Sequence, residues 1–170
     1  KVFMSPDEKL AKEWKVARDT MNRGHTQHKV LQQIESRKED KIKFISVQEK
    51  HADIIFEMIK SEKNSGNLAL KIICNNIIYA DFLVSFWSKE LKLSVEHRYL
   101  DDNHQQIIID GEVSKSLLTD KTEKFLPHIK ESLYPHNPEW VDGYSGLMCQ
   151  LIAYVIFYNN GLSLFNRAEK

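Results

Sequence analysis

The sequence predicts an α/β protein with a mixed sheet flanked by helices. Three observations carry this prediction: two helical patterns lie within the first 40 residues, four strand patterns follow between residues 52 and 113, and further helical patterns occupy residues 115–158. An order of helices, then strands, then helices is typical of chains that pack helices around one sheet. At 170 residues the chain is long enough to bury a sizeable core.

The first helix is expected to begin at Ser5. Pro6 suits the first helical turn, and Glu8 lies three residues after Ser5, which is the spacing of a capping box. Gly24 is expected to end the helix. Between these ends, apolar residues recur at helical spacing as one stripe: Leu10, Trp14, Ala17 and Met21.

A second helix is expected after Thr26, whose hydroxyl suits an N-cap. Arg37 and Lys38 suit its C-terminal end, where the helix dipole favours cations. Its buried side is expected to consist of Val30, Leu31 and Ile34. Apolar residues return at positions 42–45, before the first strand.

Four segments have the composition of strands: residues 52–56, 68–74, 91–98 and 105–113. The polar residues 60–67 indicate a turn or a small boundary. Residues 101–104 have the sequence Asp-Asp-Asn-His and predict a hairpin loop between the last two strands. Asp110 and Gly111 predict a turn or a bulge inside the last strand.

The C-terminal third of the chain predicts two helices. Residues 115–133 form an amphipathic pattern that is broken near Pro127. Residues 147–158 are the most apolar stretch, and with about a dozen apolar residues they fall short of the roughly 20 that span a bilayer. We therefore expect a buried core helix, capped by Asp142 or Ser145, with neighbouring glycines that allow close packing.

The charge balance excludes some classes of partner. Lys and Arg number 24, and Asp and Glu also number 24, so the formal net charge is zero. A general nucleic-acid binder would carry a surplus of Lys and Arg, so we expect no nucleic-acid partner. We also expect no membrane partner, since no segment is apolar over a sufficient length.

Cysteine and histidine usage predicts neither disulfides nor a metal site. Cys74 and Cys149 lie too far apart in sequence for a disulfide framework or a CxxC metal motif. The first falls in a predicted strand and the second in the apolar helix, so we expect two inert buried thiols in a reducing, cytoplasmic environment. The seven histidines are scattered, and no carboxylate completes a tight metal set with them.

The most informative segment comprises residues 18–25, at the end of the first helix. Arg18 and Arg23 lie five positions apart and a glycine follows, which makes a compact positive group beside a helix stop. One interpretation is a solvated helix face, because Asp19 can pair with Lys15 or Arg23 at i,i+4 spacing. The other is a phosphoryl-transfer lid, whose arginines neutralise the transferring phosphate and move away for product release.

The sequence around these arginines contains an ordered series of elements. R-D-x-x-x-R-G at residues 18–24 is followed by Val-Leu at 30–31, Phe-Ile at 44–45, Q-x-x-x-A-D at 48–53 and an apolar strand. In this order the series resembles the lid and following region of the phosphoribulokinase/uridine kinase family. The elements R-G-H-T and Q-x-x-x-A-D favour phosphoribulokinase of the plant and cyanobacterial type. The resemblance covers roughly the first third of the chain.

The resemblance implies an ATP-dependent kinase that transfers the γ-phosphate to a sugar hydroxyl, on ribulose 5-phosphate or, in uridine kinases, on a nucleoside. ATP and Mg²⁺ are the implied cofactors, and a phosphosugar or nucleoside is the implied acceptor. By the same resemblance, Arg18 and Arg23 are the catalytic lid arginines that bind the ATP phosphates. His25 is a further candidate for cofactor binding, and Asp19 for shaping the lid.

The resemblance also implies the C-terminal part of a P-loop kinase-like fold. Residues 1–60 would be the end of the kinase domain, with the lid helix and the last strand, and residues 61–170 a C-terminal sheet-plus-helix region. The phosphate-binding loop G-x-x-x-x-G-K-[ST] does not occur in the sequence, which starts at Lys1 without a Met. We therefore expect the C-terminal portion of a longer kinase, inactive in phosphate transfer by itself.

Two alternatives remain open. The first is a nucleoside kinase of the uridine kinase type. The second is a non-catalytic module derived from a kinase, which would form a homo-oligomer or bind a partner through an exposed sheet edge near residues 91–113.

Overall fold

The computed structural model describes residues 1–5, 7–63, 67–126, 129, 133, 135–136 and 138–159. It confirms the predicted α/β class, since helices accompany five strands of a mixed sheet in this part of the chain. The chain divides into two compact units, Lys1–Cys74 and Asn75–Lys170. No helix among the described residues is long and apolar enough to cross a membrane.

The first unit is built on β1 (Val2–Met4), β2 (Ile54–Lys60) and β3 (Leu68–Asn75). β1 runs parallel to β2, whereas β3 runs antiparallel to β2, which makes this a mixed sheet. The buried side chains of its strands are Ile54, Phe56, Ala69, Leu70, Ile72 and Cys74. β2 and β3 lie near their predicted positions, while β1 was not predicted because three residues are too few for an alternating pattern.

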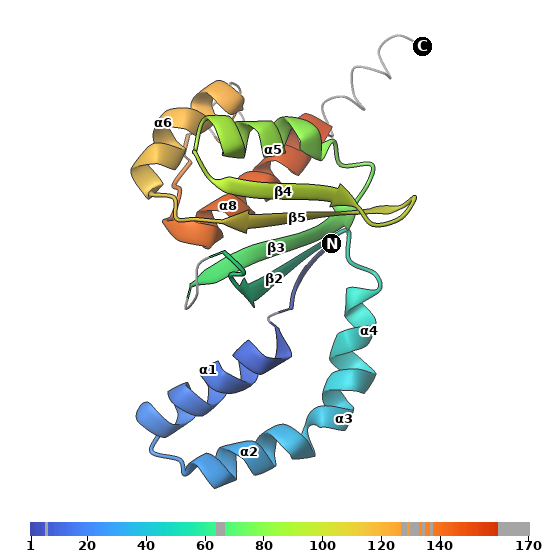
Figure 1. Cartoon of the computed structure of the whole chain (residues 1–170), viewed down its shortest axis with the longest axis vertical. Helices are drawn as coiled ribbons and strands as arrows, with labels where there is room; N and C mark the ends of the chain where they lie inside the picture. The colour runs from blue at the N-terminus through green and yellow to red at the C-terminus, as the bar shows by residue number, and fades with distance from the viewer. Residues whose placement is uncertain are drawn as a thin grey trace. The chain divides into compact units, whose positions relative to one another are not determined.

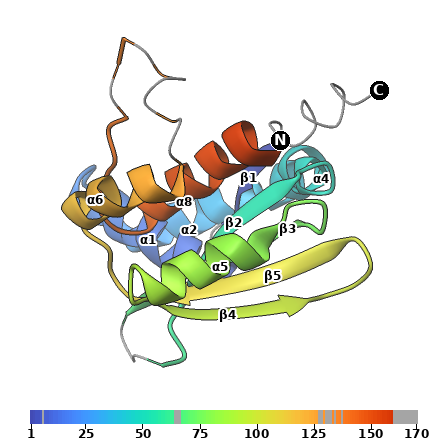
Figure 2. The same cartoon turned by 90° about the horizontal axis from the view of Figure 1, so that it is seen from above.

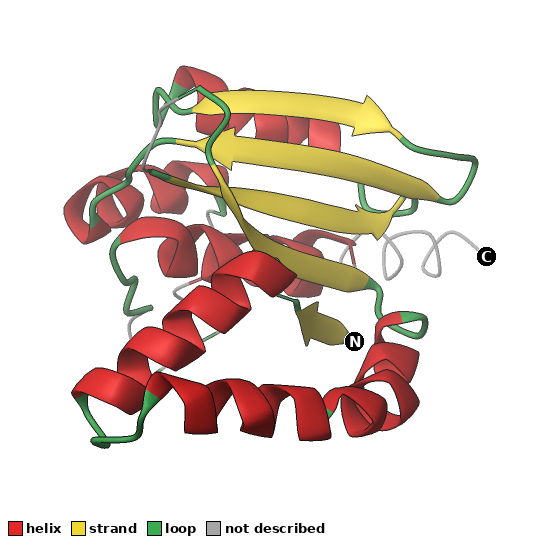
Figure 3. Ribbon diagram, turned by 60° about the horizontal axis from the view of Figure 1, so that its bottom comes forward, coloured by secondary structure: helices red, strands yellow, loops and turns green. Residues whose placement is uncertain are grey.

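A long helical excursion connects β1 to β2 (Figures 1 and 3). It consists of α1 (Glu8–Met21), α2 (Gln27–Ser36), α3 (Lys38–Asp40), the π-helical segment η1 (Lys41–Ile45) and α4 (Ser46–Glu49). The Ser5 N–H donates to the Phe56 carbonyl at 2.8 Å, and the Asp7 N–H donates to the Met58 carbonyl at 3.1 Å. These bonds anchor the start of α1 to the strand into which the excursion returns.

The beginning of α1 differs from the prediction. Asp7, not Ser5, is the N-cap, and its Oδ1 accepts a hydrogen bond from the Leu10 N–H at 3.0 Å. Ser5 instead uses its backbone N–H to continue the pairing with β2. The predicted cap of α2 is confirmed, because the Thr26 hydroxyl oxygen accepts from the Lys29 N–H at 3.4 Å.

The apolar stripe of α1 is only partly buried. Leu10 is 3% exposed, as a core residue would be, but Trp14 is 44% exposed and Met21 is 83% exposed. Ala17 is exposed as well. A helical excursion offers less covering surface than a sheet face, so hydrophobic periodicity alone overestimates burial here. In α2, by contrast, Val30 is fully buried as expected, whereas Leu31 and Ile34 are only half-buried.

The second unit contains α5 (Ala80–Lys89) and a hairpin of β4 (Ser94–Tyr99) and β5 (His104–Asp110). The hairpin is antiparallel with His97 opposite Ile107, and the predicted loop is confirmed between its strands. Helix α5 lies along β4 (Figure 2), and the Leu93 N–H donates to the Trp87 carbonyl at 3.1 Å. Helix α5 was not predicted, and its aromatic residues lie on both its buried and its exposed sides.

The last elements are α6 (Lys115–Phe125), α8 (Gly143–Tyr154) and the π-helical segment η2 (Val155–Asn159). Helix α6 ends at Phe125, before the predicted end at residue 133, and residues 127–128 lie outside the described part. The core helix is confirmed by the fully buried side chains of Leu147, Leu151 and Tyr154. Asp142 occupies its N-cap position, but the carboxylate accepts from the Lys115 N–H at 2.6 Å and so joins α6 to α8.

The two cysteines have different environments. Cys74 is buried in β3, as predicted, and burial raises the pKa of its thiol to about 12. The prediction for Cys149 is wrong, because this residue is exposed on α8. The apolar run that suggested burial is amphipathic only in part, and Cys149 falls on its outward side.

Candidate functional site

The structure brings Arg18 and Arg23 together on one carboxylate. The Nε of Arg18 donates to Oδ1 of Asp19 at 2.9 Å, and Nη1 of Arg23 lies 3.3 Å from the same oxygen. Asp19 is only 2% exposed, whereas the side chains of the two arginines are 53% and 57% exposed. We call these three residues the arginine clamp.

The clamp is shaped by the end of α1. Residues 18 and 23 belong to successive turns, and the Asn22 N–H donates to the Arg18 carbonyl at 2.9 Å. Gly24 then takes a left-handed conformation with φ +65°, which favours glycine because it has no Cβ. The His25 N–H donates back to the Asp19 carbonyl at 3.0 Å and closes the turn. This closure holds Arg23 over the buried carboxylate.

The charges of the clamp reinforce one another. The hydrogen bond from Arg18 holds the pKa of the Asp19 carboxyl below its ordinary value, against the opposing effect of burial, and the charges of Arg18, Arg23 and Lys15 act in the same direction. The Asp19 carboxylate in turn raises the pKa of Arg18. Both shifts favour the charged forms of Asp19 and Arg18, and the formal charge of two arginines and one carboxylate is one positive unit.

This arrangement is suited to binding an anion. The contacts to Asp19 engage Nε of Arg18 and Nη1 of Arg23, and the exposure of both side chains leaves other guanidinium N–H groups accessible. Guanidinium groups bind phosphate through paired, charge-assisted hydrogen bonds. The buried carboxylate restricts where the two cations can go, so less conformational entropy is lost when an anion binds.

Of the predicted site residues, Arg18 and Arg23 belong to the clamp through their side chains, and His25 contributes through its backbone. From the sequence, Asp19 is a surface partner or a residue that shapes the lid, and its burial is not predicted. A carboxylate with arginines at i−1 and i+4 at the end of a helix is the pattern that indicates one carboxylate paired with both arginines.

The implied cofactors fit the described residues unequally. The clamp fits the phosphates of ATP, because its exposed groups are cationic donors. Within residues 1–159, apart from the undescribed gaps, no group of three or more His, Cys, Asp and Glu side chains could hold a metal ion. Mg²⁺ that is bound together with substrate phosphates needs only one or two carboxylates. The buried oxygen of Asp19 is already engaged by two arginines.

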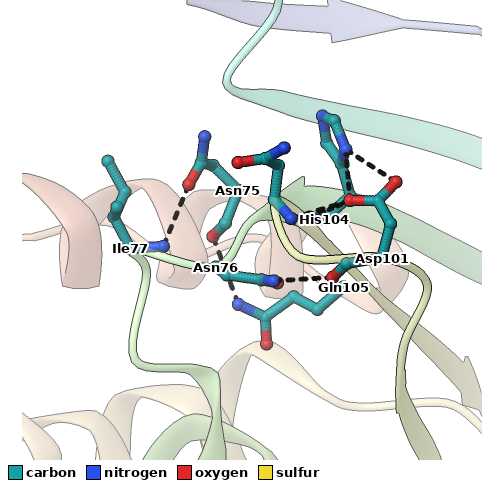
Figure 4. Close-up of polar contacts among 7 residues, drawn as sticks. Asn75, Asn76, Ile77, Asp101, His104 and Gln105 are labelled. Atoms are coloured by element: carbon teal, nitrogen blue, oxygen red, sulfur yellow. Dashed lines mark hydrogen bonds and ion pairs between the residues drawn. The ribbon is translucent and has the colours of Figure 1, made fainter.

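The second unit contains a separate polar cluster at the tip of the hairpin (Figure 4). Oδ1 of Asp101 accepts from the backbone N–H groups of Asn103 and His104 at 2.7 and 2.8 Å, and Nδ1 of His104 lies 3.0 Å from the same oxygen. These N–H groups hold the pKa of Asp101 below its ordinary value. The cluster therefore stabilises a turn, in agreement with the predicted hairpin loop.

A further set of polar contacts joins this hairpin to neighbouring segments. Nε2 of Gln105 donates to the carbonyls of Asn75 and Ile78 at 3.2 and 2.8 Å, which leaves its Oε1 to face Nε2 of His97 at 2.8 Å. Nδ1 of His97 lies 3.4 Å from Oδ1 of Asp81 on α5. Since both the nitrogen and the oxygen of the amide have hydrogen-bond partners, these contacts indicate a structural role.

Comparison with known proteins gives partial matches. Residues 1–65 match the model of the phosphoribulokinase/uridine kinase family. The phosphoribulokinase of Synechocystis sp. is 29% identical over 76 residues, which cover 42% of this chain and 23% of that protein. The chloroplastic phosphoribulokinase of Spinacia oleracea is 41% identical over 49 residues, which cover 29% of this chain and 12% of that protein.

The matched region contains the whole helical excursion and the arginine clamp. The chain matches less than a quarter of the length of each of these two relatives. The likeness is therefore to one segment of such kinases, and the residues after position 65 lie outside the family match.

Proposed function

We propose that this chain is the C-terminal part of a cytoplasmic, ATP-dependent kinase that resembles phosphoribulokinase and phosphorylates a sugar hydroxyl. Residues 1–60 would form the end of the kinase domain, and residues 61–170 a C-terminal sheet-plus-helix region. The observation that carries the proposal is the arginine clamp, since two exposed guanidinium groups share a buried carboxylate within the segment that matches the family.

In this proposal the clamp acts by charge. Bound ATP supplies the phosphoryl group and the triphosphate chain. Arg18 and Arg23 donate hydrogen bonds to phosphate oxygens and offset negative charge that redistributes during transfer. Asp19 keeps both guanidinium groups on the same side of α1, and the turn at Gly24 lets the following segment change direction. The helical excursion then serves as a lid that brings the cations to the substrate.

A chimera tests this role directly. Residues 1–65 replace the aligned segment of the Synechocystis phosphoribulokinase, and phosphorylation of ribulose 5-phosphate is measured. We expect the chimera to be active, and Arg23→Ala to lower kcat by about tenfold or more, as the loss of a charge contact in the transition state does. Arg18→Ala should have a similar effect.

The matched control is Arg37→Ala, which removes an exposed arginine of the same segment outside the clamp. Its kcat should stay within about twofold of the parent chimera, because exposed charges far from the reaction contribute little. If Arg23→Ala and Arg37→Ala both leave kcat unchanged, the lid assignment is wrong.

The acceptor separates the two kinase types. The protein that contains this chain is assayed with ribulose 5-phosphate and with uridine at equal concentrations. Preference for ribulose 5-phosphate supports the phosphoribulokinase type, and preference for uridine supports the nucleoside kinase alternative.

One observation favours the interaction-module alternative for the second unit. β4 stands last in the order of strands and pairs with β5. An end strand can pair with a second copy through its outer backbone groups. Sedimentation of the 170-residue chain decides this alternative, because a strictly monomeric species over a wide concentration range contradicts self-association through β4.

A further inference from the structure

The exposed indole of Trp14 differs from the other two tryptophans of the chain. Trp87 is fully buried and Trp140 is 4% exposed, whereas Trp14 is 44% exposed on α1. A single exposed apolar side chain is common on protein surfaces. What gives this one significance is its position relative to the arginine clamp.

Trp14 and Arg18 lie at i,i+4 on α1 and so share one face of the helix. At a rise of 1.5 Å per residue they are separated by about 6 Å along the helix axis. This is similar to the span of a ribose between a nucleobase and its first phosphate. Arg23 continues the series beyond the end of the helix and meets Arg18 at Asp19. The order along this face is therefore an aromatic ring, then two cations.

We propose that this face binds a nucleoside phosphate, with the base stacked on the indole of Trp14 and the phosphates bound by Arg18 and Arg23. This inference rests on the proposed function and deepens it. Aromatic side chains stack on bases through their π-faces, and guanidinium groups complement phosphate charge. A phosphosugar offers the phosphate but no flat ring. The inference therefore assigns the clamp to the nucleotide and not to the phosphorylated acceptor.

The structure provides its own spectroscopic probe, because the exposed indole emission comes from Trp14 while the other two tryptophans are buried. The complete 170-residue chain is titrated with ATP, inorganic tripolyphosphate and ribose 5-phosphate. We expect ATP to quench the exposed emission. Tripolyphosphate should bind, as seen by calorimetry, without quenching, since it has no base to stack.

Substitutions then separate ring stacking from charge. Trp14→Leu should weaken ATP binding by about tenfold but leave tripolyphosphate binding unchanged, and Trp14→Phe should retain most of the ATP affinity. Arg23→Ala should weaken both ligands. Val47→Ala is the matched control, since Val47 is an exposed apolar residue of α4, outside this face of α1, and it should change neither.

The binding data distinguish the stacking of the base from the role of the clamp. If ATP and tripolyphosphate bind equally and Trp14→Leu has no effect, the stacking proposal is overturned while the role of the clamp stands. If neither polyphosphate binds, or Arg23→Ala changes neither affinity, the clamp assignment fails and the stacking proposal fails with it. Circular dichroism verifies that each variant keeps its helical content, and quenching in the unsubstituted chain decides the question even where a variant does not fold.

Discussion

Asp19 determines how the two arginines behave. A buried carboxylate with two cationic partners is held in place by charge and by hydrogen bonds, while the partners stay exposed enough to bind an anion. Removing the carboxylate charge would release two guanidinium groups at once. We therefore expect substitutions at Asp19 to affect phosphate binding through the arginines, although Asp19 itself would touch no ligand.

The same residue predicts a pH dependence of stability. The pKa of Asp19 in the folded protein lies below its ordinary value of 3.8. A lowered folded pKa stabilises the protein above the ordinary value, and this contribution is lost as the pH falls through the folded pKa. The difference in unfolding free energy between the unsubstituted chain and Asp19→Asn should thus be constant above about pH 4 and shrink below it.

Chemical denaturation at a series of pH values measures this difference. Subtracting the unfolding free energy of the Asp19→Asn variant removes the contribution of other carboxylates with lowered pKa values, such as Asp101. A difference that grows as the pH is lowered would contradict the assigned ion pairs.

At the scale of elements, close contacts position α8 and local turns position the clamp. A Cβ built on Gly146 would lie 2.2 Å from the Val141 carbonyl oxygen and 2.4 Å from Cδ1 of Leu118 on α6. No side chain larger than hydrogen fits there without moving the backbone. This packing was expected from the glycines of the sequence, but only the structure identifies which glycine carries it.

The element-scale prediction follows from this contact. Gly146→Ala should lower the free energy of unfolding by about 3 kcal/mol, because overpacking forces the helices apart. Gly143→Ala is the matched control. Gly143 has φ +68° and open space around it, so its substitution should cost only about 1 kcal/mol of conformational strain. Thermal denaturation of both variants measures which substitution costs more stability. A smaller loss for Gly146→Ala than for Gly143→Ala would contradict the packing.

At the scale of the whole molecule, the similarity and the sequence signals are unevenly distributed. The clamp segment lies in the part that matches a known family. The second unit lies outside that family match and has a core of its own. That core includes a buried polar chain in which Nε1 of Trp87 donates to Gln150 at 2.6 Å, and Gln150 donates to the Thr122 hydroxyl at 2.8 Å.

This polar chain makes Gln150 a sensitive position. Gln150→Leu would leave the Trp87 N–H and the Thr122 hydroxyl without their partner in a buried site, so the free energy of unfolding should fall by about 1–3 kcal/mol for each unsatisfied group. Gln32→Leu, at an exposed position of α2, should change it by less than about 0.5 kcal/mol. Equal stability of the two variants would contradict the buried network.

The sequence predicted the α/β class, the long strands, the core helix and both arginines of the clamp. It did not predict the burial of Asp19, which depends on how the chain closes after Gly24, nor the exposure of Trp14, which depends on what covers α1. Tertiary contacts decide the burial of Asp19 and the exposure of Trp14, and local patterns do not contain them. Helix α5 was missed although its buried residues recur at helical spacing: Ala80, Leu83, Phe86 and Trp87.

The most direct test of the central claim is a double-mutant cycle between Asp19 and Arg23 on kcat of the chimera. If the clamp acts as one unit, Asp19→Asn and Arg23→Ala should each lower kcat by about tenfold or more, and the double variant should lose little beyond the larger single loss. Additive losses, or an unchanged kcat in either single variant, would contradict a shared role of these residues in phosphoryl transfer.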